Sequence, residues 1–325
     1  MPRSVVCREL RGIDGLALEE TPRQPVGPGQ VRVEIHAACL NFPDLLMTSG
    51  GYQFRPQTPY VAGMEAAGVV AETGEGVTRV RVGDRVMVGG KTGAFAEEAV
   101  VAESQLAPLP ETLTFEEGAC FRVAYQTAWY ALNERAHLKA GETLLAHGAG
   151  GGVGLAAVQI GKMMGATVIG CASSPEKLEV IRASGADHAI LYGDGPFRDE
   201  VKRLTGGKGV DVVFDPVGGE VFEQSLRCMN WGCRLLVIGF TGGVGMAATN
   251  LVLIKGASVL GVRAGESARH DPESGRRVQK ALAELAASGR LKPHISHVVP
   301  LERFREAFEL MRDRKAIGRV VIRMR

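Results

Sequence analysis

Glycine recurs at every third position in one stretch near the middle of the chain, at Gly148, Gly151 and Gly154. An apolar run, residues 143–146, precedes this stretch, and another apolar run follows it directly. Glycine tolerates positive φ in a tight turn, lets a ligand approach the backbone, and lets a helix pack closely on a strand. The N–H groups and the partial positive charge at the start of a helix attract phosphate groups. The spacing therefore predicts a strand, a turn and a helix that bind a dinucleotide, rather than a purely structural turn. The residues expected at the pyrophosphate are Gly148, Gly151, Gly152, Val153 and Gly154.

The segments around this turn alternate between short apolar runs and helix-length stretches. The apolar runs predict six parallel strands, at residues 143–146, 167–171, 188–191, 210–214, 234–238 and 258–262. Such alternation is typical of a doubly wound parallel α/β sheet, in which ligands bind at the carboxyl ends of the strands. The turn is therefore expected at the ligand-binding edge of the sheet.

The first 123 residues have a different pattern, with short strands expected at residues 31–36, 66–71 and 84–88. The C-terminal segment predicts helices at residues 276–288 and 301–312 and a closing strand at 318–322, and we expect it to return to the first domain. The predicted fold class is α/β, with a β-rich domain at residues 1–123 and 266–325 and a doubly wound domain at residues 124–265.

Length and charge limit the possible functions. A chain of 325 residues is too long for one ordinary core, so two domains are expected. The formal net charge is only +2, with basic and acidic residues interspersed, which does not indicate binding to nucleic acid or to an anionic membrane. No apolar stretch predicts a membrane span, and the charged N-terminus does not resemble a signal peptide. We therefore expect a cytoplasmic protein that acts on a small molecule. Its six scattered cysteines, none in a C-x-x-C pattern, are expected to be reduced and buried.

Several segments together resemble one family. They are residues 41–44, 63–68, 82–86, the glycine stretch, 184–187 and 215–219. In this order they resemble the medium-chain dehydrogenase/reductase superfamily, in its zinc-free, zeta-crystallin-like quinone oxidoreductase branch, over essentially the whole chain. The resemblance implies a discontinuous GroES-like catalytic domain, a Rossmann domain, a cofactor in the cleft between them, and a homodimer.

The positions that hold catalytic zinc in other members of the superfamily differ in this chain. Alignment of the same segments places Asn41, Met64 and Val123 there. An amide, a thioether and an alkyl group do not form a zinc site. The histidines His294 and His297 have a spacing found in metal sites, but the preceding proline argues against a helical pair. No metal is therefore expected.

The end of the second predicted strand indicates which dinucleotide binds. An NAD site has an acidic residue there, which accepts a hydrogen bond from the ribose hydroxyl. In this chain the strand end carries no acid, and Ser173 and Lys177 could hold a 2′-phosphate instead. By the resemblance, Tyr192 and Arg314 fall where relatives also contact that phosphate. These residues favour NADPH as the cofactor; the alternative for Lys177 is a solvated helix residue.

Without a metal, hydride must go to an acceptor that is already activated by conjugation, such as a quinone or an enone. Negative charge then gathers on a carbonyl oxygen, which needs hydrogen-bond donors. The resemblance places Asn41 and Tyr52 beside the nicotinamide as donors, with Asp44 orienting their loop. The alternative is turn formation for Asn41 and Asp44 and packing for Tyr52. Thr127 and the loop that contains Gly239 and Phe240 are expected to line the nicotinamide.

Two other functions are compatible with these residues. One is reduction of 2-enoyl thioesters on the same fold, and Arg122 is its only hint, because it could attract an anionic substrate; otherwise Arg122 forms a surface ion pair. The other, less favoured, is a non-catalytic NADPH-binding protein. His147, directly after the first strand of the sheet, is expected to pack or to orient the turn.

Overall fold

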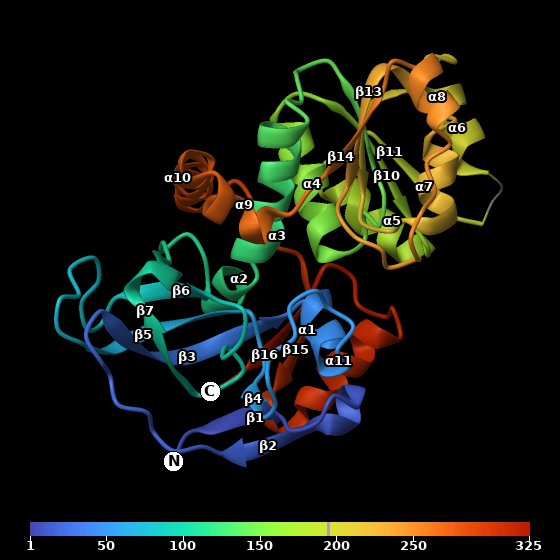
Figure 1. Ribbon diagram of the computed structural model, residues 1–325. Helices are drawn as coiled ribbons and strands as arrows, with labels where there is room; N and C mark the ends of the chain where they lie inside the picture. Colours follow the sequence, from blue (N-terminus) through green and yellow to red (C-terminus); the bar gives the residue numbers. More distant parts are fainter. Residues whose placement is uncertain (194–195) are drawn as a thin grey trace. The chain divides into compact units, whose positions relative to one another are not determined.

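The computed structural model of the protein describes residues 1–193 and 196–325 (Figure 1). These residues form two compact units. The first comprises Met1–Val123 and Leu282–Arg325, and the second comprises Ala124–Ala281. The chain thus leaves the first unit once and returns to it near its C-terminus.

The return to the first unit occurs later than residue 265, where the sequence led us to expect it. It falls within α10 (Pro272–Ser288). The reason is that α9 (Ala264–His270) and the first turns of α10 bond to the second unit. Gln126 of α3 (Arg122–Trp129) donates to the carbonyl oxygen of Ala264 at 3.4 Å. The side chains of Ser274 and Arg277 donate to Glu134, in the π-helical turn Tyr130–Arg135 that continues α3, at 3.0 and 2.8 Å.

The second unit is built on a six-stranded parallel sheet with the strand order β11-β10-β9-β12-β13-β14. Numbered from β9, this is the order 3-2-1-4-5-6 of dinucleotide-binding sheets, so the predicted doubly wound fold is confirmed. The strands are β9 (Thr143–Ala146), β10 (Thr167–Ala172), β11 (His188–Leu191), β12 (Val210–Asp215), β13 (Met229–Val237) and β14 (Ser258–Gly261). The helices between them are α4 (Gly152–Met163), α5 (Pro175–Ala183), α6 (Phe197–Leu204), α7 (Gly219–Ser225) and α8 (Thr249–Ile254).

Strand β13 begins earlier than residue 234, the predicted start. Met229 already pairs with Val210 of β12. The pairing then shifts register between Val210 and Val212, and Gly232 has a φ of +74°. A bulge of this kind accommodates an irregular segment inside a continuous strand.

The first unit contains a three-stranded and a seven-stranded sheet. The small sheet has the order β2-β1-β4, and the large one β15-β16-β3-β5-β6-β8, with β7 also paired to β3. The strands are β1 (Arg3–Cys7), β2 (Leu16–Glu20), β3 (Gln30–Leu40), β4 (Tyr60–Val61), β5 (Glu65–Thr73), β6 (Arg85–Gly89), β7 (Glu98–Ala102), β8 (Leu106–Pro108), β15 (Ile295–Pro300) and β16 (Arg319–Arg323). The helices are α1 (Phe42–Thr48), α2 (Phe115–Ala119) and α11 (Phe304–Arg312), with 3₁₀ turns at Gly12–Gly15, Glu103–Gln105 and Leu301–Arg303. Because β16 pairs with β3, C-terminal residues complete the sheet that N-terminal residues begin.

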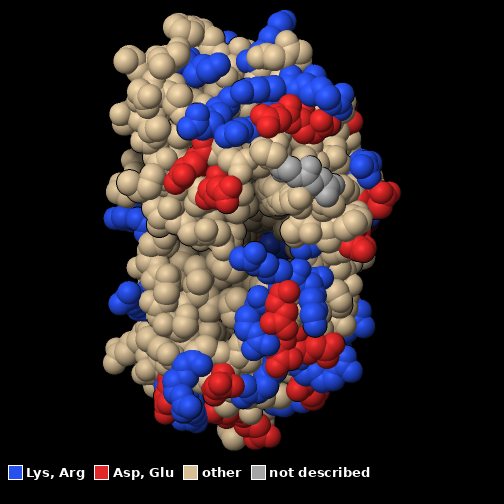
Figure 2. Space-filling model, turned by 90° about the vertical axis from the view of Figure 1, so that its right-hand side faces the viewer, with Lys and Arg blue, Asp and Glu red and all other residues tan. Residues whose placement is uncertain are grey.

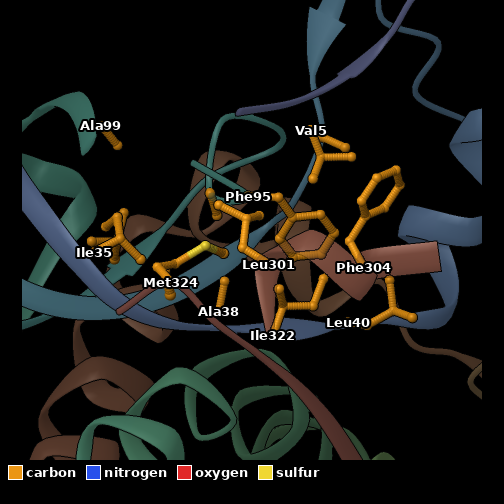
Figure 3. Close-up of a cluster of buried hydrophobic side chains, with 14 of the residues drawn as sticks. Val5, Ile35, Ala38, Leu40, Phe95, Ala99, Leu301, Phe304, Ile322 and Met324 are labelled. Atoms are coloured by element: carbon orange, nitrogen blue, oxygen red, sulfur yellow. The ribbon is translucent and has the colours of Figure 1, made fainter. Parts of the chain in front are cut away.

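Buried apolar side chains from both ends of the chain fill the core of the first unit (Figure 3). Phe95 is fully buried and meets the ring of Phe308 edge to face, with centroids 6.0 Å apart. Gly63 lies against the same ring, and a Cβ atom there would stand 2.4 Å from it, at a φ of +98°. The glycine that opens the segment 63–68 is therefore required by close packing on Phe95.

Acidic and basic side chains lie beside one another on the face of the molecule shown in Figure 2. Some ion pairs join residues one helical turn apart, such as Arg203 with Glu200 at 2.6 Å and Arg182 with Glu179 at 2.8 Å. None of the helices in the described part of the chain is long and apolar enough to cross a membrane.

Candidate functional site

The glycine turn lies at the carboxyl end of β9 and leads directly into α4. Gly148 has a φ of +54°, a conformation that residues with a side chain rarely adopt. A Cβ atom at Gly154 would lie 2.3 Å from the carbonyl oxygen of Gly148. At Gly151 the nearest atom would be 3.4 Å away, an ordinary contact. The fold itself therefore requires glycine at positions 148 and 154, whereas at 151 it tolerates a Cβ atom.

Several backbone N–H groups of the turn are used inside the fold. Those of His147 and Ala149 donate to the neighbouring strands β12 and β10, and that of Gly151 donates to Gly148, each at 2.9 Å. The N–H groups in the first turn of α4, which begins at Gly152, have no carbonyl partner within the helix. The N-cap residue Gly151 supplies no side chain to bond them, and no acidic residue lies in this turn. The start of α4 thus has the geometry of an anion site, with Gly152, Val153 and Gly154 as donors.

The residues expected at a 2′-phosphate follow β10. Ser173 is exposed, and Lys177 lies in the first turns of α5. A Cβ atom at Gly150 would lie 2.9 Å from Cβ, Cγ and Cδ of Lys177, so the aliphatic stem of this lysine crosses the glycine turn. The carboxylate of Glu176, beside it, accepts a hydrogen bond from the side chain of Ser174, which lowers the pKa of Glu176. The side chain of Lys177 thus lies at the turn, and the carboxylate of the nearby Glu176 bonds to Ser174, the N-cap residue of α5.

Tyr192 has a contact that the sequence did not suggest. Its hydroxyl lies 2.8 Å from Nδ1 of His147 and accepts a hydrogen bond of 3.4 Å from the N–H group of Gly148. His147 is fully buried and lies 2.8 Å from Oγ of Ser225 through Nε2. Burial lowers the pKa of His147 to about 3, so the imidazole is neutral. His147 thus packs inside the unit, which is one of the two roles expected for it.

Two further loops at the carboxyl ends of strands bond to each other. Asp215, at the end of β12, accepts hydrogen bonds from the N–H groups of Val217 and Gly218 at 2.8 and 2.9 Å. The loop that holds Gly239 and Phe240 then donates to this segment, for example from the N–H group of Gly242 to Val217 at 2.7 Å. Phe240 remains 48% exposed, and Thr127 is half-buried in α3. Both loops thus lie at the edge of the sheet where the glycine turn lies.

In the first unit, Asn41 and Asp44 are brought together at the start of α1. The N–H group of Asn41 donates to Oδ2 of Asp44 at 2.8 Å, which forms a capping box. The amide nitrogen of Asn41 donates to Oε1 of Glu65 at 3.0 Å and to the carbonyl oxygen of Cys39 at 3.3 Å, and its amide oxygen accepts from Arg319 at 3.0 Å. Every polar atom of the Asn41 side chain is therefore bonded within the unit.

Glu65 and Arg319 form a buried ion pair beside Asn41. The other carboxylate oxygen of Glu65 accepts from the N–H group of Val123, at the start of α3, at 2.8 Å. Burial raises the pKa of Glu65, and the positive charge of Arg319 opposes that shift. Burial also raises the pKa of Asp44 to about 8, and no hydrogen-bond partner in the described ranges reaches its Oδ1. At neutral pH Asp44 is therefore mostly a neutral acid.

Two further predicted residues, Tyr52 and Arg314, also belong to the first unit. Tyr52 is half-buried in the segment between α1 and β4. Arg314 is exposed just after α11 and has a φ of +58°, which is uncommon for a residue with a side chain.

The three positions that correspond to metal ligands have other roles. Asn41 and Val123 bond to Glu65, and the carbonyl oxygen of Met64 accepts from Gly90 at 2.8 Å. Across residues 1–193 and 196–325, no three His, Cys, Asp or Glu side chains are grouped to hold a metal ion. His297 bonds through Nδ1 to Ser296 at 2.8 Å.

Arg122 is neither a surface ion pair nor an exposed cation. Its guanidinium donates to the carbonyl oxygens of Gln105 and Met87, and a Cβ atom at Gly89 would lie 2.8 Å from it. Burial lowers the pKa of Arg122. The guanidinium of Arg122 thus bonds to β6 and to the 3₁₀ turn Glu103–Gln105, and the surface ion pair expected as one alternative was wrong.

Both units contain segments that match models of known protein families. Residues 27–111 match the family model of the alcohol dehydrogenase GroES-like domain, and residues 152–288 match that of the zinc-binding dehydrogenases. The chain is 38% identical over 324 residues to the quinone oxidoreductase-like protein 2 homolog of Nematostella vectensis, which covers 98% of this chain and 88% of that protein. The chain belongs to the quinone oxidoreductase branch of the medium-chain dehydrogenase/reductase superfamily.

Solved structures of this superfamily match the whole chain. A quinone oxidoreductase from Pseudomonas syringae pv. Tomato DC3000 superposes with a TM-score of 0.90 at 31% identity and covers 100% of both chains. The JamJ enoyl reductase superposes with a TM-score of 0.88 at 28% identity, also over 100% of both chains. The protein is therefore an oxidoreductase of a superfamily that binds nicotinamide cofactors, and its units are the GroES-like and Rossmann folds expected from the sequence.

Glu65 and Arg319, two charged residues buried in the first unit, were not among the predicted site residues. Each stands at the start of a strand and is followed directly by apolar residues, Glu65 in β5 and Arg319 in β16. Opposite charges at the starts of two such strands are a usable signal, because a buried charge needs a partner.

Substitution of alanine at two glycines separates folding from cofactor binding. Gly154→Ala should cost roughly 1–3 kcal/mol of unfolding free energy, because its Cβ atom overlaps the turn. Gly151→Ala should fold with nearly unchanged stability but bind the nicotinamide cofactor about tenfold more weakly, since its Cβ atom stands at the start of α4. Chemical denaturation and cofactor titration measure the two effects. Tight binding to Gly151→Ala would place the cofactor elsewhere.

The buried acid Asp44 should make stability depend on pH. Between an unfolded pKa near 3.9 and a folded pKa of about 8, the folded protein keeps a proton that the unfolded chain releases. The contribution of Asp44 to stability is therefore full below about pH 4 and falls as pH rises to about 8. Asp44→Asn should gain stability relative to the natural protein by on the order of 1 kcal/mol or more between pH 5 and pH 9. Denaturant-induced unfolding at pH 5 and at pH 9 measures this difference in unfolding free energy, with the exposed Asp14→Asn as the control. If stability depends on pH in the same way in the two variants, the prediction is contradicted.

Proposed function

We propose that the protein is a cytoplasmic, zinc-independent reductase that uses NADPH to reduce quinones or other α,β-unsaturated carbonyl compounds. The observation that carries the proposal is the start of α4, where uncapped N–H groups and the stem of Lys177 meet at one turn. Such a site suits a pyrophosphate with an additional phosphate nearby.

The residues that would hold NADPH fit its chemical groups. The pyrophosphate would lie at Gly152, Val153 and Gly154, and the 2′-phosphate near Ser173 and Lys177. When bound, the nicotinamide supplies the hydride. Thr127, Gly239 and Phe240 are proposed for the nicotinamide side, and Arg314 for the 2′-phosphate.

For the substrate carbonyl, we propose Tyr52 as the hydrogen-bond donor. Both amide hydrogens of Asn41 are engaged by Cys39 and Glu65, so Asn41 would break a buried network if it bonded a substrate. We therefore assign Asn41 and Asp44 to holding the start of α1 in place. A conjugated acceptor is favoured because Asn41, Met64 and Val123 supply no ligand set for a Lewis acid that would activate a plain ketone.

A second candidate is reduction of 2-enoyl thioesters, which the likeness to an enoyl reductase supports. Its hint in the sequence was Arg122, and that guanidinium bonds to backbone carbonyl oxygens instead. The quinone or enone function is therefore favoured.

Steady-state kinetics distinguishes the two substrates. NADPH oxidation should be faster, by kcat/KM, with 1,4-naphthoquinone than with crotonyl-CoA. A chelator should leave the rate unchanged, and elemental analysis should find no stoichiometric zinc. A much higher kcat/KM for the thioester would favour the second candidate, and turnover of neither compound would favour a non-catalytic nucleotide-binding protein.

Lys177 provides the test of cofactor choice. Lys177→Met keeps the apolar stem over Gly150 and removes the charge, so it should weaken NADPH about tenfold or more and NADH hardly at all. Fluorescence titration measures both dissociation constants, and Lys202→Ala on the exposed face of α6 is the control. Equal losses for the two nucleotides would mean that another residue binds the phosphate.

We also propose that two copies of the chain pair through β14, the edge strand of the parallel sheet. Apolar side chains are exposed around this edge: Trp231 (75%), Leu253 (80%), Ile254 (63%) and Val259 (37%). The ring of Trp231 lies against Gly256, two residues before β14 begins. An exposed apolar edge is a ready surface for strand pairing, and a two-fold axis makes it complementary to itself.

Light scattering after size exclusion should give the mass of a dimer. Val259→Lys should give the mass of a monomer, because it puts charge on the pairing edge, whereas Val82→Lys, exposed in the first unit, should not change the mass. A monomeric natural protein would contradict the proposal.

A further inference from the structure

A buried chain of hydrogen bonds joins the glycine turn to α7, and its direction can be worked out from its two ends. Ser225 donates its only hydroxyl proton to the carbonyl oxygen of Val221 at 2.7 Å, so its oxygen can only accept from His147. Nε2 of His147 therefore carries the proton, and Nδ1 is an acceptor. The hydroxyl of Tyr192 must then donate to Nδ1, which leaves the tyrosine oxygen to accept from the N–H group of Gly148.

Each donor in this chain thus has an acceptor, and no second arrangement satisfies all of them. A protonated imidazole would have two donors and would face the Tyr192 proton, and the buried imidazole is neutral, as its lowered pKa indicates. The rings of Phe197 and Tyr192 pack on the imidazole, with centroids 4.8 and 6.1 Å from its own. The side chains are therefore fixed by packing as well as by hydrogen bonds.

This series of hydrogen bonds ends at Gly148, the position where the backbone of the turn is most constrained. Gly148 has positive φ, its carbonyl oxygen accepts from Gly151, and a Cβ atom at Gly154 would touch that same oxygen. A rotation of the Gly148 peptide would therefore move the start of α4. The N–H group of Gly148 is also used by Tyr192, so it is not a phosphate donor.

We propose that His147, Tyr192 and Ser225 are positioning residues that set the orientation of the Gly148 peptide and, through it, the phosphate-binding start of α4. This inference rests on the proposed cofactor site. It differs from the expectation that Tyr192 contacts the 2′-phosphate, because the tyrosine hydroxyl lies under the turn and acts on the pyrophosphate end that NADPH and NADH share.

Binding of the two nucleotides separates these roles. Tyr192→Phe and Ser225→Ala should each weaken NADPH and NADH by the same factor, roughly five- to tenfold. Ser225→Thr keeps the hydroxyl and should restore affinity to near the natural value. A loss confined to NADPH in Tyr192→Phe would mean a direct phosphate contact and would overturn the proposal, as would unchanged affinity for both nucleotides in Ser225→Ala.

A measurement without cofactor tests the hydrogen bonds of His147 themselves and does not depend on whether the variants bind a nucleotide. In the natural protein, ¹⁵N NMR of the His147 imidazole should show the neutral form with the proton on Nε2, unchanged from pH 8 down to about pH 5. In Ser225→Ala this preference should weaken. A proton on Nδ1, or an imidazole that titrates near neutral pH, would overturn the proposal.

The nucleotide titrations distinguish the positioning role from the choice of cofactor. If the natural protein prefers NADH and the variants lose equal affinity for both nucleotides, the proposed cofactor is contradicted but the positioning role is supported.

Discussion

A buried ion pair between Glu65 and Arg319 joins parts of the first unit that are 254 residues apart in sequence. Glu65 is 1% exposed and Arg319 5% exposed, and the carboxylate also bonds Asn41 and the N–H group of Val123. One carboxylate thus fixes the starts of α1 and α3, while its partner lies on the last strand, β16. Loss of one member of such a pair costs about 3–5 kcal/mol, because it leaves an unpaired charge in the interior. The start of α1, where Asn41 lies, is therefore held by the C-terminal strand.

The second unit depends on close backbone contact at the carboxyl ends of its strands. Gly154 approaches the carbonyl oxygen of Gly148, and Gly218 approaches that of Gly243, so closely that a Cβ atom would lie 2.3 and 2.2 Å away. Glycine at position 154 lets α4 start close against the turn after β9, and glycine at position 218 lets the loops after β12 and β13 lie against each other. The N–H groups at the start of α4 are then the donors that the fold leaves for an anionic ligand.

Local patterns in the sequence were enough to predict the parallel sheet and the glycine turn. Spacing of glycines and alternation of apolar runs report on neighbours within a few residues, and these determine strands, turns and helices. Contacts between distant residues were not predictable in this way. Tyr192 lies 45 residues after His147, and Ser225 lies 78 residues after it, so nothing local indicates that their side chains meet. The boundary at residue 281 likewise depends on Ser274 and Arg277 bonding to Glu134.

In the function that we propose, the helix start at Gly152 holds NADPH for hydride transfer to a conjugated carbonyl compound. Transfer of an isotope label tests this function most directly. With NADPH deuterated at one face of C4 and an enone as the acceptor, mass spectrometry of the product should find deuterium on the carbon β to the carbonyl, from one of the two labelled faces only. Product without deuterium from either labelled nucleotide would contradict the claim.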